Sequence, residues 1–322
     1  MESILVTGGA GFIGSHICKV LAEQGFQPIA YDNLALGHRF AVKWGPLIVG
    51  DIKNQNLIKQ TCKKYNPIGM MHLAALSNVR QSQLMSLEYY QNNVASCFSL
   101  LKAICDCQVP YLIFSSSCSV YGSPQILPLD ENHPLCPMHP YGKSKWIIEN
   151  VFTSLFESGK AHVGCLRYFN VAGADPGREI GELHEPETHV IPSLINAALQ
   201  QAPAFTLYGE DHNTPDGTPI RDFIHVTDVA HAHVKLLRKL MGGTKHLILN
   251  LGTGHGYSIQ EIIHALKMQF NRPIPIVVKK KNSSDPPILI ANPDQAKQTL
   301  NWTPKLSTLP LMLETAWNWL SR

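Results

Sequence analysis

A glycine-rich loop that follows a short apolar run restricts the fold of this chain more than any other feature. The run Ile4–Thr7 predicts a buried strand, and the segment Thr7-Gly8-Gly9-Ala10-Gly11-Phe12-Ile13-Gly14 continues from it into a helical pattern. In this context the early glycines permit a tight turn and let the backbone approach a pyrophosphate at the positive end of the helix dipole. Gly14 allows the helix to pack closely on the strand. The structural alternative is a merely tight strand-to-helix turn.

Alternating strand and helix patterns continue through the first half and predict a parallel sheet with helices on both faces. Beyond residue 170 the composition changes, because 13 of the 22 prolines lie there and short apolar runs stand among turns. We therefore expect a doubly wound Rossmann α/β sheet over residues 1–169 and a smaller α+β substrate part over residues 170–322, with sheet elements shared across the boundary. The expected strands are Ile4–Thr7, Pro28–Asp32, Leu47–Gly50, Met70–Ala74, Leu112–Ser116 and Val163–Tyr168.

The overall composition excludes several classes of partner. The chain of 322 residues is 44% hydrophobic, enough for a buried core, and its formal net charge is only +3. So weak a surplus does not favour capture of nucleic acid or of an anionic membrane, and no apolar run approaches the ~18 residues of a spanning helix. We therefore expect small-molecule partners, no nucleic acid and no membrane.

Cysteine and histidine usage predicts a reducing compartment and no metal centre. The eight cysteines include no C-x-x-C pair, which is typical of buried thiols rather than of a disulfide framework. Glu2 lies where a secretion signal needs cations. His231 and His233, two apart on an expected helix, point to different faces and cannot share a ligand. We expect a cytoplasmic protein without a metal site.

Carboxylates and small residues at the ends of the expected strands indicate a dinucleotide site. Asp32 ends the second strand, where it can accept hydrogen bonds from both ribose hydroxyls, which favours NAD over NADP. Asp51 follows the third strand and could reach an adenine amino group, while Ala74 and Ala75 let the backbone lie against a flat ligand. The residues expected to contact NAD are Gly8, Gly11, Phe12, Ile13, Gly14, Asp32, Asn33, Asp51, Ile52, Leu73, Ala74 and Ala75.

Tyr141 and Lys145 form a candidate catalytic pair, because residues four apart share one face of a helix. A phenol with a pKa near ~10 is a poor base, but a nearby ammonium and an oxidised nicotinamide would both lower that pKa. The hydroxyls of Ser115–Ser117, at the end of the fifth strand, could relay the proton. The structural alternative is an i,i+4 pair on a solvated helix face.

Further motifs extend over nearly the whole chain and carry a family resemblance. They are Glu88-Tyr89-Tyr90-Gln91-Asn92-Asn93-Val94, Ser119-Val120-Tyr121-Gly122, Arg167-Tyr168-Phe169-Asn170, Thr214-Pro215-Asp216-Gly217-Thr218 and Arg221-Asp222-Phe223-Ile224-His225-Val226. With the glycine loop and the Tyr141–Lys145 pair, they make the chain resemble the extended short-chain dehydrogenase/reductases, and within them the UDP-glucose 4-epimerases.

The resemblance implies a role for particular residues. Ser117, Tyr141 and Lys145 would be catalytic, with Tyr141 and Lys145 also touching the cofactor, and Asn92 and Phe169 would line its nicotinamide end. A homodimer through the helices in residues 85–107 and 141–158 is also implied. The implied substrate-binding residues are Ser117, Asn170, His189, Val190, Tyr208, Arg221, Asp285 and Leu289.

Some positions depart from the family pattern or have ordinary alternatives. Ser77 stands in place of a lysine near the cofactor phosphates, and Asn282 in place of a second diphosphate-binding arginine. His189 is a variant that the family also shows.

From the residues alone, Arg221 could bind phosphate or pair with its neighbour Asp222. Tyr208 could lie against a uracil ring or be a core aromatic.

The implied activity is NAD-dependent interconversion of UDP-glucose and UDP-galactose. The hexose would be oxidised at C4, the 4-keto sugar would turn over, and hydride would return to its opposite face. Alternatives are 4-epimerisation of a UDP-N-acetylhexosamine or another UDP-sugar, reduction of a 4-keto sugar nucleotide, and a non-catalytic NAD-sensing module. Cys118-Ser119 stands where dehydratases carry an acid/base pair, which disfavours elimination of water. Leu289 would border the sugar's 2-position, where its intermediate size predicts weak activity on N-acetylated sugars.

Overall fold

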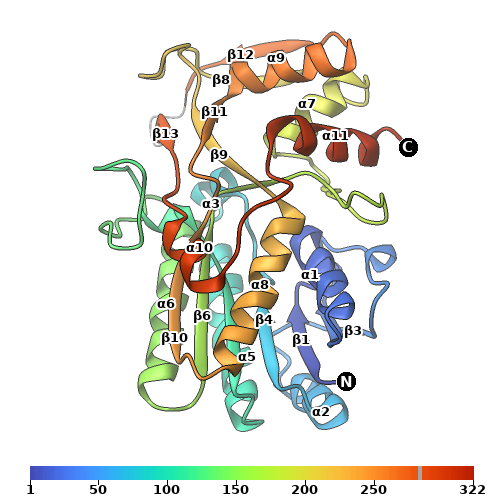
Figure 1. Ribbon diagram of the computed structural model, residues 1–322, viewed down its shortest axis with the longest axis vertical. Coiled ribbons are helices and arrows are strands. Elements are labelled where there is room, and N and C mark those ends of the chain that lie inside the picture. The colour runs from blue at the N-terminus through green and yellow to red at the C-terminus, as the bar shows by residue number, and fades with distance from the viewer. Residues whose placement is uncertain (282–284) are drawn as a thin grey trace.

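The computed structural model describes residues 1–281 and 285–322, so Asn282 lies outside the described residues. Its larger part is a seven-stranded, all-parallel sheet with the order β10-β6-β5-β4-β1-β2-β3 (Figure 1). The expected α/β fold with a parallel sheet is confirmed. The strands of this sheet are β1 (Ser3–Thr7), β2 (Gln27–Asp32), β3 (Leu47–Val49), β4 (Gly69–His72), β5 (Tyr111–Ser117), β6 (His162–Tyr168) and β10 (His246–Leu251).

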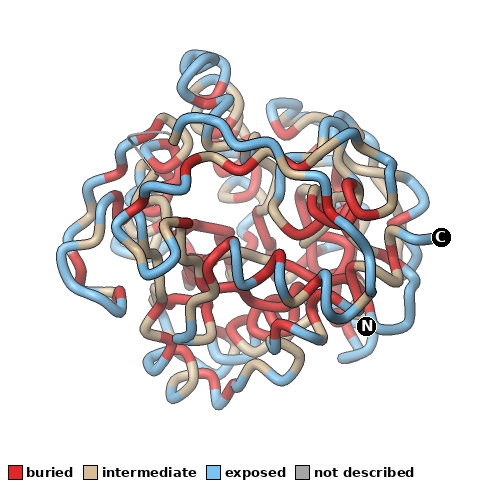
Figure 2. The backbone as a smooth tube through the Cα atoms, turned by 90° about the horizontal axis from the view of Figure 1, so that it is seen from above, coloured by how far each residue is buried: buried red, intermediate tan, exposed pale blue. Residues whose placement is uncertain are grey.

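Helices cover both faces of this sheet because its central strands are apolar on both sides. In β1, Ile4 and Val6 pack into one core cluster, whereas Leu5 packs into the other, and all three are almost completely buried. Figure 2 shows buried chain through the centre of the molecule. The first cluster includes residues of α1 (Phe12–Glu23), α8 (Val226–Met241) and α10 (Asp294–Leu300), and the second those of α2 (Gln55–Tyr65), α5 (Ser96–Asp106) and α6 (Pro140–Glu157).

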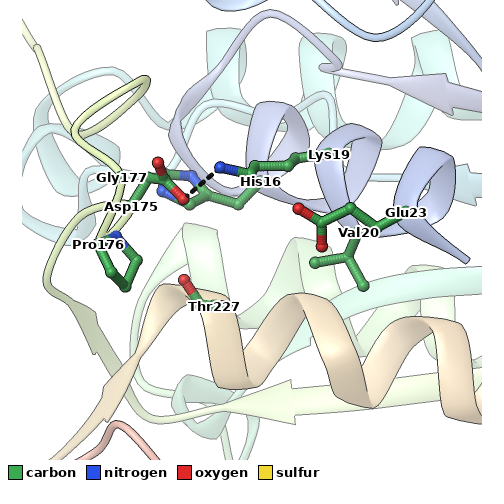
Figure 3. Close-up of a pocket in the computed structure, with 8 residues that line it drawn as sticks. All are labelled: His16, Lys19, Val20, Glu23, Asp175, Pro176, Gly177 and Thr227. Atoms are coloured by element: carbon green, nitrogen blue, oxygen red, sulfur yellow. Dashed lines mark hydrogen bonds and ion pairs between the residues drawn. The ribbon is translucent and has the colours of Figure 1, made fainter.

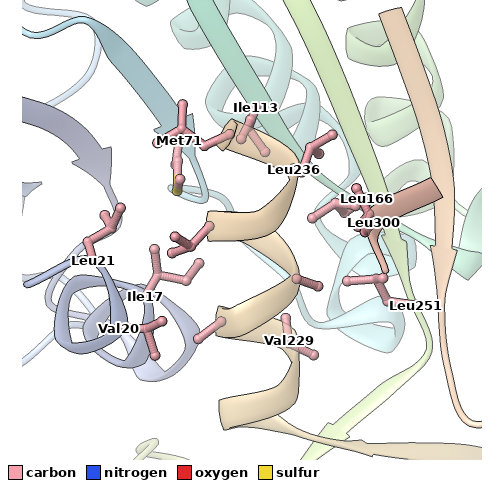
Figure 4. Close-up of a cluster of buried hydrophobic side chains, with 14 of the residues drawn as sticks. Ile17, Val20, Leu21, Met71, Ile113, Leu166, Val229, Leu236, Leu251 and Leu300 are labelled. Carbon is pink, nitrogen blue, oxygen red and sulfur yellow. The ribbon is translucent and has the colours of Figure 1, made fainter. Parts of the chain in front are cut away.

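Helix α8 lies beside α1 on the first face of the sheet and covers β5 and β6 there (Figure 4). Its Val229 and Leu236 contact the same cluster as Ile17 of α1 and Leu166 of β6. Both α8 and β10 come from beyond residue 170. The chain therefore returns to the large sheet after building part of the smaller one.

The connection from β4 to β5 is helical but interrupted. It contains α3 (Val79–Leu84), α4 (Ser86–Tyr90) and a π-helical turn, η2 (Gln91–Ala95), which leads into α5. Short 3₁₀ turns, η1 (Arg39–Ala41) and η3 (Cys118–Val120), follow β2 and β5. Within the described residues, no helix is long and apolar enough to cross a membrane.

The smaller part lies beyond the carboxyl ends of the large sheet (Figure 1). Its core is built from apolar residues of its helices and strands, such as Leu194, Leu207, Ile262 and Met312. Its elements are the strands β7 (Asn170–Ala172), β9 (Ile220–His225), β11 (Gly256–Ser258) and β13 (Ile288–Leu289) of one sheet, the pair β8 (Phe205–Tyr208) and β12 (Ile276–Lys279), and the helices α7 (Val190–Ala198), α9 (Ile259–Phe270) and α11 (Leu309–Leu320).

Candidate active site

The β1–α1 loop has the form of a cradle for a phosphate group. Gly8 has φ +74°, and a Cβ there would lie 2.8 Å from the backbone nitrogen of Ala74. A Cβ on Gly14 would lie 2.0 Å from the carbonyl oxygen of Gly8, so no larger residue fits. Helix α1 starts at Phe12, with Ile13 next, and no side chain caps its first turn. Its first N–H groups are therefore available to an anion.

Asp32 lies at the end of β2 beside this loop. Its carboxylate accepts hydrogen bonds from the backbone nitrogens of Ala10 (3.0 Å) and Leu34 (2.8 Å). These bonds hold the carboxylate between the glycine loop and the end of β2. Asp32 is 8% exposed. Asn33 follows, and its side-chain oxygen accepts a hydrogen bond from the nitrogen of Ala35 (3.0 Å). The position suits recognition of a ribose at the loop.

A cavity of about 510 Å³ lies where the loops after β3 and β4 meet the η2–α5 helix. Asp51 and Asn92, both predicted cofactor residues, line it together with Leu76. Asp51 accepts a hydrogen bond from the nitrogen of Lys53 (3.0 Å), and the adjacent Ile52 is buried. After β4, the predicted cofactor residues Leu73, Ala74 and Ala75 are half-buried, and Ser77, also predicted to contact the cofactor, is exposed.

Tyr141, Lys145 and Ser117 converge at the end of β5. Proline at N1 starts α6, which places Tyr141 and Lys145 in its first two turns. The Lys145 ammonium lies 5.7 Å from the centroid of the Tyr141 ring and donates a hydrogen bond to the carbonyl of Ser115 (2.7 Å). The Ser117 hydroxyl is near enough to the Tyr141 side chain to lower the pKa of the phenol. Ser117 Oγ also accepts from the nitrogen of Ser119 (3.2 Å).

Burial governs the titration of this pair. It raises the pKa of Tyr141 to about 12, against the smaller, lowering effect of the Ser117 hydrogen bond. Burial lowers the pKa of Lys145 to about 8. The sequence predicts that the Lys145 ammonium and an oxidised nicotinamide together lower the phenol pKa, whereas among the chain's own groups the effect of burial is the larger.

Asn93, which the sequence did not single out, joins three segments behind the pair. Its side chain accepts a hydrogen bond from the nitrogen of Leu76 (2.8 Å) and donates to the carbonyl of the same residue (2.9 Å). It also donates to Ser144 Oγ (3.2 Å), and that hydroxyl donates to the Tyr141 carbonyl (2.7 Å). Its neighbour Asn92 donates to Asn93 Oδ1 (3.0 Å). The only sequence signal was its place in the Asn92-Asn93 pair.

Several predicted substrate residues come together around β9. Arg221 pairs with Leu289 of β13, and Asn170 of β7 pairs with Phe223 two residues further along β9. Arg221 donates hydrogen bonds to the carbonyls of Ile220 (2.9 Å) and Pro287 (3.3 Å). Arg80 of α3 contacts both Tyr208 and Asp285 and so links them to this group. No sequence pattern singled out Arg80.

The ordinary alternative for Arg221, pairing with Asp222, is not what the structure has. The Asp222 carboxylate accepts hydrogen bonds from the nitrogens of Thr253, Gly254 and Ala291, and from the Thr253 hydroxyl. Its bonds thus hold together β9, the loop after β10 and the segment after β13. The charged groups that act on Arg221 are instead Asp285 and Arg80.

His189, Val190 and Phe169 have different surroundings. Phe169 is buried beside Cys118 and Tyr121, and Val190 is the first, half-buried residue of α7. His189 contacts Glu182 (2.6 Å) and Glu187 (3.3 Å). Attraction by the Glu182 carboxylate raises the pKa of His189 well above its usual value. With His184, these donors lie within 4.8 Å of one another, a spacing that a metal ion could also bridge.

A second cavity, of about 240 Å³, lies between α1, the start of α8 and the turn at residues 175–177 (Figure 3). Lys19 pairs with Asp175 across it (2.8 Å), while Glu23 and the hydroxyl of Thr227 face it from the two helices. None of the predicted site residues lines this cavity. It is thus separate from the candidate active site.

Comparison with known proteins places this geometry in a family. A model of the NAD dependent epimerase/dehydratase family matches residues 4–252. A UDP-glucose 4-epimerase of Rhizobium leguminosarum bv. trifolii is 42% identical over 318 residues, which is 99% of this chain and 97% of the relative.

Solved structures agree. The UDP-glucose 4-epimerase of Brucella ovis, in complex with NAD, superposes with a TM-score of 0.96 at 42% identity, covering 99% of this chain and 98% of that one. The enzyme of Bifidobacterium longum, in complex with NAD⁺ and UDP, superposes with a TM-score of 0.95 at 32% identity, covering 99% and 98%. The resemblance read from the sequence is thereby confirmed, and the chain belongs to the NAD dependent epimerase/dehydratase family, where its relatives are UDP-glucose 4-epimerases.

Proposed function

We infer that this protein interconverts UDP-glucose and UDP-galactose with NAD as its bound cofactor. One observation carries the conclusion: Tyr141, Lys145 and Ser117 converge at the carboxyl end of β5, on the sheet edge that also bears the glycine loop. The relatives that share this chain over its whole length are UDP-glucose 4-epimerases. An open α/β sheet binds its ligands at this edge.

The residues present fit NAD. Gly8 and Gly14 leave space that a Cβ would fill, the first turn of α1 is uncapped, and Asp32 is held at the end of β2. We propose that Asp51 and Asn92, which line the neighbouring cavity, contact the same cofactor. Held by these residues, NAD would supply a reversible hydride acceptor for the sugar C4.

Within this proposal, Tyr141 holds the proton of the sugar 4-hydroxyl. Ser117, which lies near Tyr141, orients the O4 atom and shares that proton. Lys145 keeps its charge below a pH of about 8 and lies close enough to stabilise the phenolate as it forms. Tyr141 returns to its starting protonation state in each cycle, because the proton returns to O4 when the 4-keto sugar is reduced on its other face.

The substrate's nucleotide would lie at β9 and β8. Arg221 has N–H groups for phosphate oxygens, and Tyr208 offers a ring to uracil. Asp285 would accept hydrogen bonds from the sugars, and Asn170 could both accept and donate them. Leu289 lies beside these residues. His189 and Val190, at the start of α7, would complete the site from the other side.

The test is turnover by the purified protein without added nicotinamide. UDP-galactose should be converted to an equilibrium mixture with UDP-glucose, and acid extraction of the protein should release NAD. Asp32→Ala should lower the amount of NAD that copurifies. Stoichiometric consumption of added NADH, with no conversion in its absence, would instead identify a reductase and overturn the proposal.

We further propose a homodimer and a cytoplasmic location. Leu87, Phe98 and Trp146 are 74%, 48% and 39% exposed on α4, α5 and α6, and such apolar side chains on adjoining helices suit an interface between copies. All eight cysteines are free, which suits a reducing compartment. Sedimentation at micromolar concentration tests the dimer; a monomer there would contradict it.

A further inference from the structure

Arg80 reaches across from the large sheet to the proposed nucleotide site. It lies in the first turn of α3, in the connection that follows β4, and its side chain is 45% exposed. Its guanidinium carbon lies 3.5 Å from the centroid of the Tyr208 ring, at the end of β8. At this distance the guanidinium lies over the aromatic face, in a cation–π contact.

The charges around Arg80 do not balance. Its Nη2 lies 3.7 Å from Asp285 Oδ2, beyond hydrogen-bond distance. Arg221 belongs to the same group, since burial and then repulsion by Arg80 lower its pKa, while attraction by Asp285 raises it. Two guanidinium groups thus share one nearby carboxylate among the described residues, which leaves a positive excess. An anion placed between them would relieve the repulsion.

The contact with Tyr208 also leaves N–H groups of Arg80 for an anion. The guanidinium carbon lies over the ring, and the N–H groups around that carbon can donate hydrogen bonds beside it. A diphosphate attached to a nucleoside at Tyr208 would then meet Arg80 on one side and Arg221 on the other.

We propose that Arg80 is a second guanidinium that binds the diphosphate of the nucleotide sugar, together with Arg221. The inference rests on the proposed function and adds to it a residue from the cofactor-binding part. Because Arg80 comes from α3 and Arg221 from β9, the diphosphate is held by both parts of the molecule. The contact with Tyr208 holds Arg80 in position before the anion arrives.

Binding of UDP and of uridine, measured by titration calorimetry, tests this assignment. Arg80→Gln removes the charge and keeps a planar polar group on a shorter side chain, and Arg80→Ala removes both the charge and the polar group. Each should weaken UDP binding about 10- to 100-fold, the usual effect of losing a hydrogen bond to a charged group, while uridine binding changes little. Arg272→Ala, at an exposed arginine elsewhere in the smaller part, is the matched control and should bind both as the wild type does.

The outcomes separate this inference from the proposed function. If wild-type protein binds UDP and the Arg80 variants bind it equally well, Arg80 does not touch the diphosphate. If UDP and uridine binding fall in parallel, Arg80 supports the Tyr208 ring only, and the inference is again wrong. A wild type that binds neither compound would contradict the proposed function itself. In turnover assays the variants should raise KM for UDP-galactose and leave kcat nearly unchanged.

Discussion

Tyr141 and Lys145 stand one helical turn apart, and burial shifts their pKa values in opposite directions, to about 12 and about 8. Each shift favours the uncharged form of its group. Proton transfer at this site therefore needs groups that stabilise the phenolate only when it forms. Ser117 and the Lys145 ammonium are the chain's contributions, and both are already held by hydrogen bonds.

Tyr141→Phe should reduce epimerase turnover by about 10²-fold or more, the usual effect of removing a general base. The ring and its packing remain, so the folded state should persist. Tyr65→Phe removes a phenol hydroxyl at the end of α2 and serves as the control. Conversion of UDP-galactose, followed by chromatography, is the measurement. Near-normal turnover by the Tyr141 variant would require a different base.

Leu289 is expected to set the tolerance for a substituent at the sugar's 2-position. It is half-buried in β13, directly opposite Arg221 of β9. UDP-glucose and UDP-galactose should be the best substrates, with UDP-N-acetylglucosamine slower by a factor that corresponds to ~1–3 kcal/mol. Leu289→Tyr should abolish the N-acetyl activity, whereas Leu289→Ser should raise it. Unchanged ratios of kcat/KM in both variants would show that another residue sets this preference.

At the scale of elements, a buried ion pair joins α6 to β6. Arg167 donates hydrogen bonds to both carboxylate oxygens of Glu149, at 2.9 and 2.8 Å, and both side chains are 3% exposed. This contact fixes α6, which carries Tyr141 and Lys145, against the strand beside β5. A bidentate pair of this kind holds its helix at a fixed position and angle.

Glu149→Gln should lower the free energy of unfolding by about 3–5 kcal/mol, because it leaves the Arg167 charge buried without its partner. Urea denaturation provides the measurement. Asp106→Asn is the control, since the Lys59–Asp106 pair joins α2 to α5 at 2.7 Å but both side chains are about 40% exposed. Equal effects of the two substitutions would contradict the role assigned to burial.

The six strands named from sequence were found because each is a short apolar run, and a helical pattern follows the first, third, fourth and fifth of them. β10 was missed, although it completes the sheet. Its pairing with β6 joins segments far apart in the chain, and alternation of strands and helices says nothing about such contacts. Arg80 was missed for the same reason, since its partner Tyr208 follows it by more than a hundred residues. The glycine-rich loop could be predicted from the sequence, because the residues that define it lie within one contiguous segment.

For the molecule as a whole, buried histidines predict a loss of stability in acid. Burial lowers the pKa of His16, His225 and His233 to about 4, and that of His72 to about 3, from 6.5 in the unfolded chain. Between these values the unfolded chain binds more protons, so stability falls as the pH drops below 6.5. Each histidine contributes on the order of 2 kcal/mol to this loss at pH 5.

Urea denaturation at pH 7.5 and pH 5 should therefore give a lower free energy of unfolding at the acid value. His233→Gln should reduce the difference between the two pH values, because it removes one of the groups that titrate. His264→Gln, at an exposed position on α9, should leave the difference as it is in the wild type. A free energy of unfolding that is equal at both pH values would refute the prediction.

The place of β10 and α8 in the large sheet bears on how the protein is made. A ribosome delivers the chain from its amino end, so β6 emerges without its outer neighbour, and the apolar face covered by α8 stays uncovered in the meantime. The nascent sheet cannot be finished until residue 251 has left the ribosome, by which time much of the smaller part has also been synthesised. Folding of the cofactor-binding part is consequently a late event in translation, and a fragment that stops at residue 169 would expose Ile113, Leu166 and the edge of β6 to aggregation.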